Sequence, residues 1–163
     1  MVTPAQRQTL IERYAHGHRA VLDALAGVTD VELDAKPGEG WTAREVVHHL
    51  ADSEMTSAIR LRRLLVEDAP ALPGYDEEAF ARCLRYAERP IQPALDALAA
   101  ARSTSLQILL LMTEADWRRA GTHSQSGAYS AEDWLEIYAC HAHDHAAQLN
   151  QILRMARTGT SAA

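Results

Sequence analysis

His141 and His145 lie four residues apart in a stretch whose apolar pattern predicts a long helix near the C-terminus. An α-helix advances about 100° per residue, so residues four apart share a face, one turn apart. His143 lies about 200° from His141 and is expected to face water. The other residues on the face of His141 and His145 mark it as the inward one: Trp134, Ile137, Tyr138, Gln148 and Ile152. Two imidazoles on such a face can hold a divalent cation between them.

A third histidine comes from a separate predicted helix, which runs from a capping box of Thr42 and Glu45 to about Glu67. Its apolar face is defined by Val46, Leu50, Ser57, Leu61 and Leu64. His49 lies about 100° from the centre of this face, and its neighbour His48 lies about 160° away, on the back. Of the pair, His49 is therefore the one expected to reach inward.

Polar residues border the same apolar face beside His49. They are Asp52, Ser53 and Thr56. An apolar stripe with such a border predicts one wall of a pocket.

His49, His141 and His145 are the predicted ligands of a divalent metal ion. Neutral imidazole binds zinc-like ions, and a catalytic site commonly uses three protein ligands and leaves one position open. An ion held in this way lowers the pKa of a water or thiol at the open position. The chain has no His-Glu-x-x-His motif, which excludes the helical metalloproteases. The run from His141 to His145 is one residue short of the His-x-His-x-Asp-His motif of metallo-β-lactamase-type hydrolases and lies in a helical pattern, so that class is rejected.

The elements that position these histidines are predicted to form an all-α fold, a four-helix bundle with an additional short helix. The first long helix begins at Thr3-Pro4 and ends before Gly27, and the third spans Pro93 to about Ala115. Asp76-Glu77-Glu78 opens the short helix, which ends at Arg89-Pro90. Ser130 and Asp133 form a capping box that starts the last long helix.

The remaining segments are predicted to be connections without strands. They cover Val28 to Gly40, Asp68 to Asp76, and Trp117 to Tyr129. His123, in the last of them, is expected to be exposed. His18, on the inward stripe of the first helix, is expected to be a core-edge histidine, with lining the site as the alternative.

The length of 163 residues fits a single domain over residues 1–163. No apolar run approaches the roughly 18 residues that a membrane span needs, and no signal-peptide pattern is present, so a cytoplasmic protein is expected.

The net charge of -6 argues against a nucleic-acid partner. The one basic cluster, Arg60, Arg62 and Arg63, is expected to be a solvated helix face. Cys83 and Cys140 are too far apart in sequence to indicate a cysteine zinc site.

Three separated segments resemble one known family. Trp41–Glu54 resembles the signature of the DinB superfamily and of its YfiT-like branch, as do Gly74-Tyr75-Asp76-Glu77 and the run Tyr138–His141 with His145 and Gln148. The resemblance covers nearly the whole chain. It implies a four-helix bundle that binds zinc or nickel through three histidines, at the positions of His49, His141 and His145, and a homodimer. Members of the family are described as metal-dependent hydrolases or as transferases of a low-molecular-weight thiol such as bacillithiol.

The resulting hypothesis is a metal-dependent enzyme that transfers a low-molecular-weight thiol to an electrophilic small molecule. The first alternative is a hydrolase that uses water at the open position, with Asp52 as its candidate general base. The second alternative is a non-enzymatic metal- or ligand-binding module of a stress response.

Overall fold

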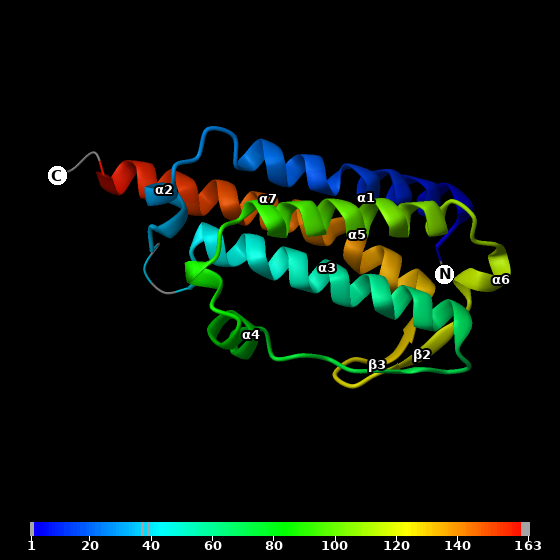
Figure 1. Cartoon of the computed structure of the whole chain (residues 1–163). Helices are drawn as coiled ribbons and strands as arrows, with labels where there is room; N and C mark the ends of the chain where they lie inside the picture. The colour runs from blue at the N-terminus through cyan, green and yellow to red at the C-terminus, as the bar shows by residue number, and fades with distance from the viewer. Residues whose placement is uncertain (1, 37, 39, 161–163) are drawn as a thin grey trace.

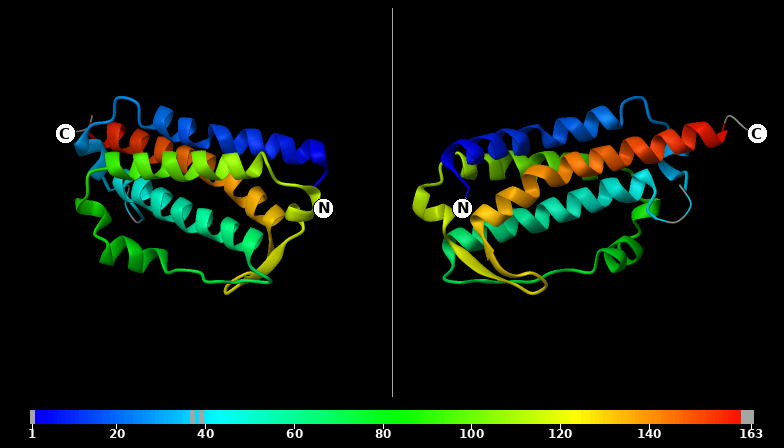
Figure 2. Two further views of the ribbon diagram at one scale, coloured as in Figure 1. Left: turned by 45° about the vertical axis from the view of Figure 1, so that its right-hand side comes forward. Right: turned by 180° about the vertical axis from the view of Figure 1, so that it is seen from behind.

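Four long helices lie side by side in the computed structural model, which describes residues 2–36, 38 and 40–160 (Figure 1). They are α1 (Pro4–Ala24), α3 (Ala43–Val66), α5 (Gln92–Leu109) and α7 (Ala131–Thr160). The predicted all-α four-helix bundle is confirmed. Figures 1 and 2 show that α1 and α7 run in one direction while α3 and α5 run in the other. Since α3 and α5 are parallel and follow one another among the long helices, the chain needs a long connection from the end of α3 back to the start of α5.

The helices begin where their capping residues predict. Thr42 accepts a hydrogen bond from the backbone N–H of Glu45, whose carboxylate accepts one from the backbone N–H of Thr42. Ser130 and Asp133 make the same reciprocal pair. Such boxes satisfy backbone N–H groups that the first helical turn leaves without partners. The predicted starts of the two helices that carry the histidines are confirmed.

The connection from α3 to α5 crosses the outside of the bundle and carries β1 (Ala71–Leu72), α4 (Glu77–Cys83) and the 3-10 turn η1 (Tyr86–Glu88). The predicted short helix is therefore present as α4, but it ends at Cys83, so Tyr86 belongs to a separate turn. Parallel neighbours need a crossover of this length because a tight turn can join only antiparallel helices. This crossover is the segment that places residues against the outer side of α3.

The prediction of no strands was wrong. β2 (Ala120–His123) and β3 (Gly127–Ser130) form an antiparallel hairpin, and β1 pairs with β2 in parallel, with Leu72 opposite His123. Strands of two to four residues carry no alternation long enough to predict them. Gly121 is required here because a Cβ at that position would lie 2.3 Å from the carbonyl oxygen of Pro70.

Two short helices were also missed. α2 (Asp30–Asp34) lies in the predicted connector, and α6 (Glu114–Trp117) is separate from α5, which ends at Leu109 rather than near Ala115. Thr29 and Thr113 each cap one of them with a capping box. A helix of one turn has too few residues to display a helical period.

A buried ion pair lies between two hydrophobic clusters of the core. Arg102 of α5 donates to Glu54 of α3 at 2.7 Å, and the Tyr14 hydroxyl of α1 donates to the other carboxylate oxygen at 2.5 Å. Arg102 also donates to the carbonyl oxygen of Tyr14 at 2.5 Å and stacks over its ring at 3.8 Å. Gly17 leaves room for this guanidinium, because a Cβ there would lie 2.6 Å from Arg102 Nη2. Arg102 also donates to the carbonyl oxygen of Tyr138 on α7 at 3.4 Å, so the network joins all four long helices.

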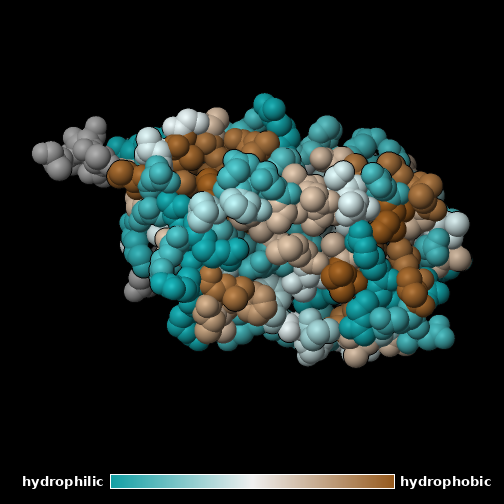
Figure 3. All heavy atoms as spheres, viewed as in Figure 1, coloured by the Kyte–Doolittle hydropathy of each residue, from teal (hydrophilic) through white to brown (hydrophobic). Residues whose placement is uncertain are grey.

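The outer surface carries scattered apolar side chains. On the face drawn in Figure 3, hydrophobic residues form separate patches among hydrophilic ones. Within the described ranges, no helix is long and apolar enough to cross a membrane.

Candidate metal centre

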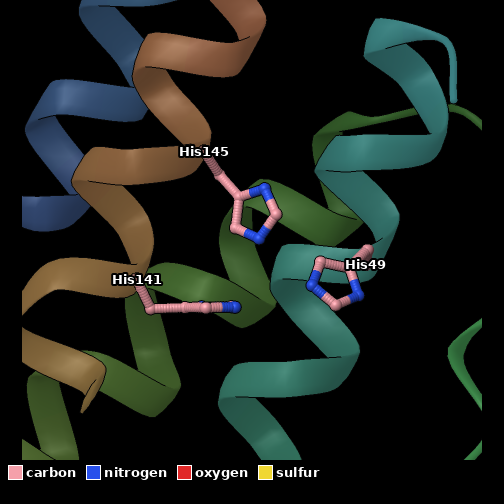
Figure 4. Close-up of side chains that lie close together, drawn as sticks. All are labelled: His49, His141 and His145. Atoms are coloured by element: carbon pink, nitrogen blue, oxygen red, sulfur yellow. The ribbon is translucent and has the colours of Figure 1, made fainter. Parts of the chain in front are cut away.

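Three imidazole rings from two helices converge in the bundle (Figure 4). His49 comes from α3, and His141 and His145 come from consecutive turns of α7. One ring nitrogen from each lies within 4.8 Å of those of the other two. The ring centroids of His49 and His145 are 4.8 Å apart, and those of His141 and His145 are 4.6 Å apart. The structure thus brings together the three residues that helical spacing selected.

Burial keeps two of these rings in the neutral form at neutral pH. Desolvation, with a smaller contribution from His145, lowers the pKa of His49 to about 4. Desolvation and the neighbouring histidines lower the pKa of His141 to about 3. A histidine binds a metal ion through the lone pair of its neutral ring, so both rings are in the form that a ligand requires.

The metal-free protein is expected to lose stability as the pH falls from 7 to 5. In the unfolded chain His49 and His141 both have a pKa near 6.5, so below that pH the unfolded state takes up protons that the folded state excludes. The stability is therefore present above pH 6.5 and is lost as the pH falls toward the folded pKa values. For His49 alone, the loss between pH 6.5 and 5 is about 2 kcal/mol.

Urea denaturation with a chelator present, at pH 7, 6 and 5, measures this loss. The variant His49→Gln is expected to reduce the pH dependence, with the contribution of His141 remaining, whereas His16→Asn, a change at an exposed position of α1, is expected to leave it intact. An unfolding free energy that does not change between pH 7 and 5 would contradict the prediction.

Gln148 fixes the orientation of the third ring. Its side-chain oxygen lies 2.7 Å from His145 Nδ1. An amide oxygen can only accept, so Nδ1 carries the proton and the lone pair is left on Nε2. A partner of this kind on the far side of a metal-ligating imidazole is common and increases the affinity for the metal.

Replacing Gln148 with leucine is expected to weaken zinc binding about 10-fold, because the ring of His145 loses the bond that sets its tautomer and orientation. Competition with a chromogenic chelator measures the affinity. Gln151→Leu is the matched control, since Gln151 is exposed on the same helix. Equal affinities for the two variants would show that Gln148 does not act through His145.

A polar cavity of about 190 Å³ adjoins the histidines, and His141 forms part of its wall. Helices α3 and α7, the crossover and the hairpin all contribute to it. The other lining residues are Ser53, Arg60, Tyr75, Glu77, His123, Gln125, Ile137 and Tyr138. Glu77 Oε2 also lies 4.0 Å from His49 Nδ1. The site therefore combines a possible ion position with a pocket for a small molecule.

Three expectations about this region were wrong. His123 is buried, because the hairpin pairs with β1 at the start of the crossover. Ile137 is 48% exposed and lies at the cavity rather than in the core. Arg60 is only 8% exposed, although it was expected on a solvated face. Helical spacing could have predicted this burial. Arg60 follows His49 by eleven residues, which is close to three full turns, so the two side chains share a face of the helix.

Asp52 and His48 are both in contact with Tyr86 of the crossover. The carboxylate of Asp52 accepts a hydrogen bond of 2.5 Å from the hydroxyl of Tyr86, and Asp52 does not belong to the described lining of the cavity. His48 is buried beneath the same tyrosine ring, and its Nε2 lies 3.1 Å from the carbonyl oxygen of Arg89. The crossover thus covers the back of the helix, which sequence spacing alone does not reveal.

The two remaining histidines discussed above lie outside the cluster. His143 contacts the carbonyl oxygen of Arg13 at 2.9 Å and is partly covered by α1, so it does not simply face water. His18 is partly buried and is not part of the described lining of the cavity.

Comparisons with known proteins identify similar chains over most of the length. The model of the DinB superfamily matches residues 9–149. A protein of Oceanobacillus iheyensis, named "Putative metal-dependent hydrolase", is 34% identical over 137 residues, which cover 83% of this chain and 79% of that protein. YfiT of Bacillus subtilis, which carries the same description, is 32% identical over 133 residues, covering 80% of this chain and 75% of YfiT.

The solved structure of YfiT is similar across nearly the whole fold. Its TM-score is 0.89 at 29% sequence identity, and the match covers 98% of this chain and 91% of YfiT. That structure is described as a probable metal-dependent hydrolase with an unusual four-helix bundle topology.

Proposed function

This chain belongs to the DinB superfamily, and we propose that it is a metal-dependent enzyme in which His49, His141 and His145 hold a divalent ion, zinc or nickel. The observation that carries the proposal is the convergence of three imidazoles beside a small polar cavity. When bound, the ion would supply Lewis acidity, which favours the deprotonated form of a thiol or water.

The donor set fits such an ion. Zinc–nitrogen bonds of about 2 Å place tetrahedral ligand atoms roughly 3.3 Å apart, so small rotations of the side chains would close the present spacing of 4.8 Å or less. His49 and His141 are neutral, and His145 is oriented by Gln148. Three protein ligands, rather than four, are typical of sites that act on a substrate.

We favour transfer of a low-molecular-weight thiol to an electrophilic small molecule. In this reaction the sulfur forms a bond to the electrophilic carbon, the bond to the leaving group breaks with its electron pair, and the thiol proton passes to solvent. Within the described part of the chain, Glu77 is the one carboxylate with an oxygen within 4.0 Å of a nitrogen of the three histidines. A thiol has a pKa near 8.5, so it loses its proton more readily than water and depends less on a nearby base. The single carboxylate described near the histidines therefore favours a thiol over water.

Hydrolysis is the second candidate, and the names of the relatives favour it. Here the oxygen of water bonds to an acyl carbon, the bond to the leaving group breaks, and a proton from the water passes to that group. The base would be Asp52 or Glu77. Glu77 is better placed, because it lines the cavity, while Asp52 accepts a hydrogen bond from Tyr86 and is outside the described lining.

A paired assay separates the two reactions. Zinc- or nickel-loaded protein is incubated with a chromogenic aryl halide and a panel of cellular thiols, and separately with chromogenic esters and amides without thiol. Thiol transfer predicts a rate well above that of the thiol alone in the first arm only. Turnover only in the second arm would favour the hydrolase, and no turnover in either arm with the metal bound would leave the non-enzymatic module.

A further inference from the structure

We propose that the cavity beside the histidines recognises a carboxylate group of the substrate, with Arg60 as its counter-charge. This inference rests on the proposed function, and it assigns to Arg60 the choice among substrates. The observation behind it is the buried guanidinium of Arg60, which has no carboxylate partner in the part of the chain that the structure describes.

Arg60 is held in place by neutral groups. Its Nη2 donates to the carbonyl oxygen of Pro73 at 2.6 Å, and its Nη1 donates to the hydroxyl of Tyr138 at 3.4 Å. Its Nε is buried and has no hydrogen-bond partner among the described residues. No carboxylate in the described ranges approaches the guanidinium within 4.0 Å, in contrast to Arg102, which pairs with Glu54.

An unmatched buried charge is costly, and buried charges in proteins are normally paired. The nearest candidate on the cavity wall is Glu77, but its side chain is 55% exposed and lies outside ion-pair distance of Arg60. The guanidinium thus retains its charge, and the N–H groups of Nη1 and Nη2 that bond neither Tyr138 nor Pro73 are left for an anion that enters the cavity.

The lining selects a singly charged anion. Burial lowers the pKa of His123, so that ring adds no second positive charge at neutral pH. The carboxylate of Glu77 on the same wall disfavours a doubly charged phosphate. Burial raises the pKa of Tyr75 to about 12, so its hydroxyl stays protonated and can donate to an anion. One arginine with neutral donors matches a carboxylate, which accepts such bonds at both oxygens.

The cavity also sets where the carboxylate lies in the molecule. His141 belongs to both the histidine cluster and the cavity wall. A substrate with its reacting group at the histidines would therefore place a carboxylate only a few atoms away. Short thiols and other small molecules that bear a carboxylate meet this condition.

A pair of probes that differ only in the carboxylate tests the proposal. Succinate monohydroxamate and its methyl ester both carry a hydroxamate, which binds zinc without any reaction. Isothermal titration of the zinc-loaded protein is expected to show at least tenfold tighter binding of the acid. The variant Arg60→Met is expected to abolish that preference, whereas Arg62→Met is expected to keep it, since Arg62 contacts α5 and does not line the cavity.

A readout without metal makes the test independent of the histidine site. In zinc-free protein, added propionate is expected to shift the Arg60 Nε–H resonance in nitrogen–proton correlation spectra. Should Arg60→Met fail to fold, Arg60→Lys keeps the charge and is expected to retain a reduced preference for the acid.

The outcomes separate this proposal from the function on which it rests. Equal affinities of the acid and the ester in the wild type, or no propionate shift at Arg60, would overturn the carboxylate site even if the enzyme turns over thiols. A preference for the acid that depends on Arg60, together with no turnover in either assay, would support the carboxylate site and reject the enzyme.

Discussion

Replacing His145 with alanine is expected to lower zinc affinity by roughly 100- to 1,000-fold, because one of three ligands to the ion is lost. The rate of the metal-dependent reaction should fall to that of the uncatalysed one. Metal analysis after dialysis against a weak chelator, followed by competition titration, measures the change. Of the three histidines, His145 gives the clearest test, because His143 on the same helix provides a control.

His143→Ala is that control. The two histidines are two residues apart on α7, but His143 contacts the carbonyl oxygen of Arg13 on α1, away from the cluster. Its loss is expected to leave zinc affinity within about twofold of the wild type, on the order of 0.4 kcal/mol. If His145→Ala retained one equivalent of zinc at the original affinity, the three-histidine site would be wrong.

Replacing Glu54 with alanine is expected to destabilise the fold by about 3–5 kcal/mol, because the Arg102 guanidinium would remain buried without its carboxylate. Tyr14 would also lose the acceptor for its buried hydroxyl. Urea or guanidinium denaturation of the metal-free protein measures the loss. The exposed pair Arg63 and Glu67 offers a comparison, and Glu67→Ala is expected to leave the denaturation midpoint unchanged.

A double variant separates the loss of the carboxylate from the loss of packing. Glu54→Leu with Arg102→Met replaces the pair by apolar side chains and is expected to recover most of the stability lost in Glu54→Ala. If Glu54→Ala were as stable as the wild type, the ion pair would not be what holds α3 and α5 in register.

Local sequence patterns were sufficient to predict the four long helices and the histidine cluster. Capping boxes and helical spacing depend on residues within a few positions of one another, and both helices that carry the histidines follow them. The convergence of His49 with His141 and His145 then follows from packing the two inward faces together. The bundle thus places these residues with little contribution from the connections.

The cavity could not be predicted in the same way. Arg60 was expected in solvent, and it becomes buried only because the chain after α3 folds back over it, where Pro73 accepts its hydrogen bond. Asp52 borders the apolar face on the helical wheel, and the structure adds a hydrogen bond to it from Tyr86 of the same crossover. These outcomes depend on contacts between segments that are distant in sequence, which periodicity does not encode.

The histidines and much of the cavity wall belong to different kinds of segment, and this has a consequence for how such proteins diverge. The histidines lie on rigid helices, whereas Tyr75, Glu77, His123 and Gln125 lie on the crossover and the hairpin. Surface connections accept substitution and changes of length far more readily than packed helices. Evolution can therefore change the part of the cavity wall that these two segments contribute while the histidines and Arg60 stay on their helices, and grafting the two segments between relatives would measure how much of the selectivity they carry.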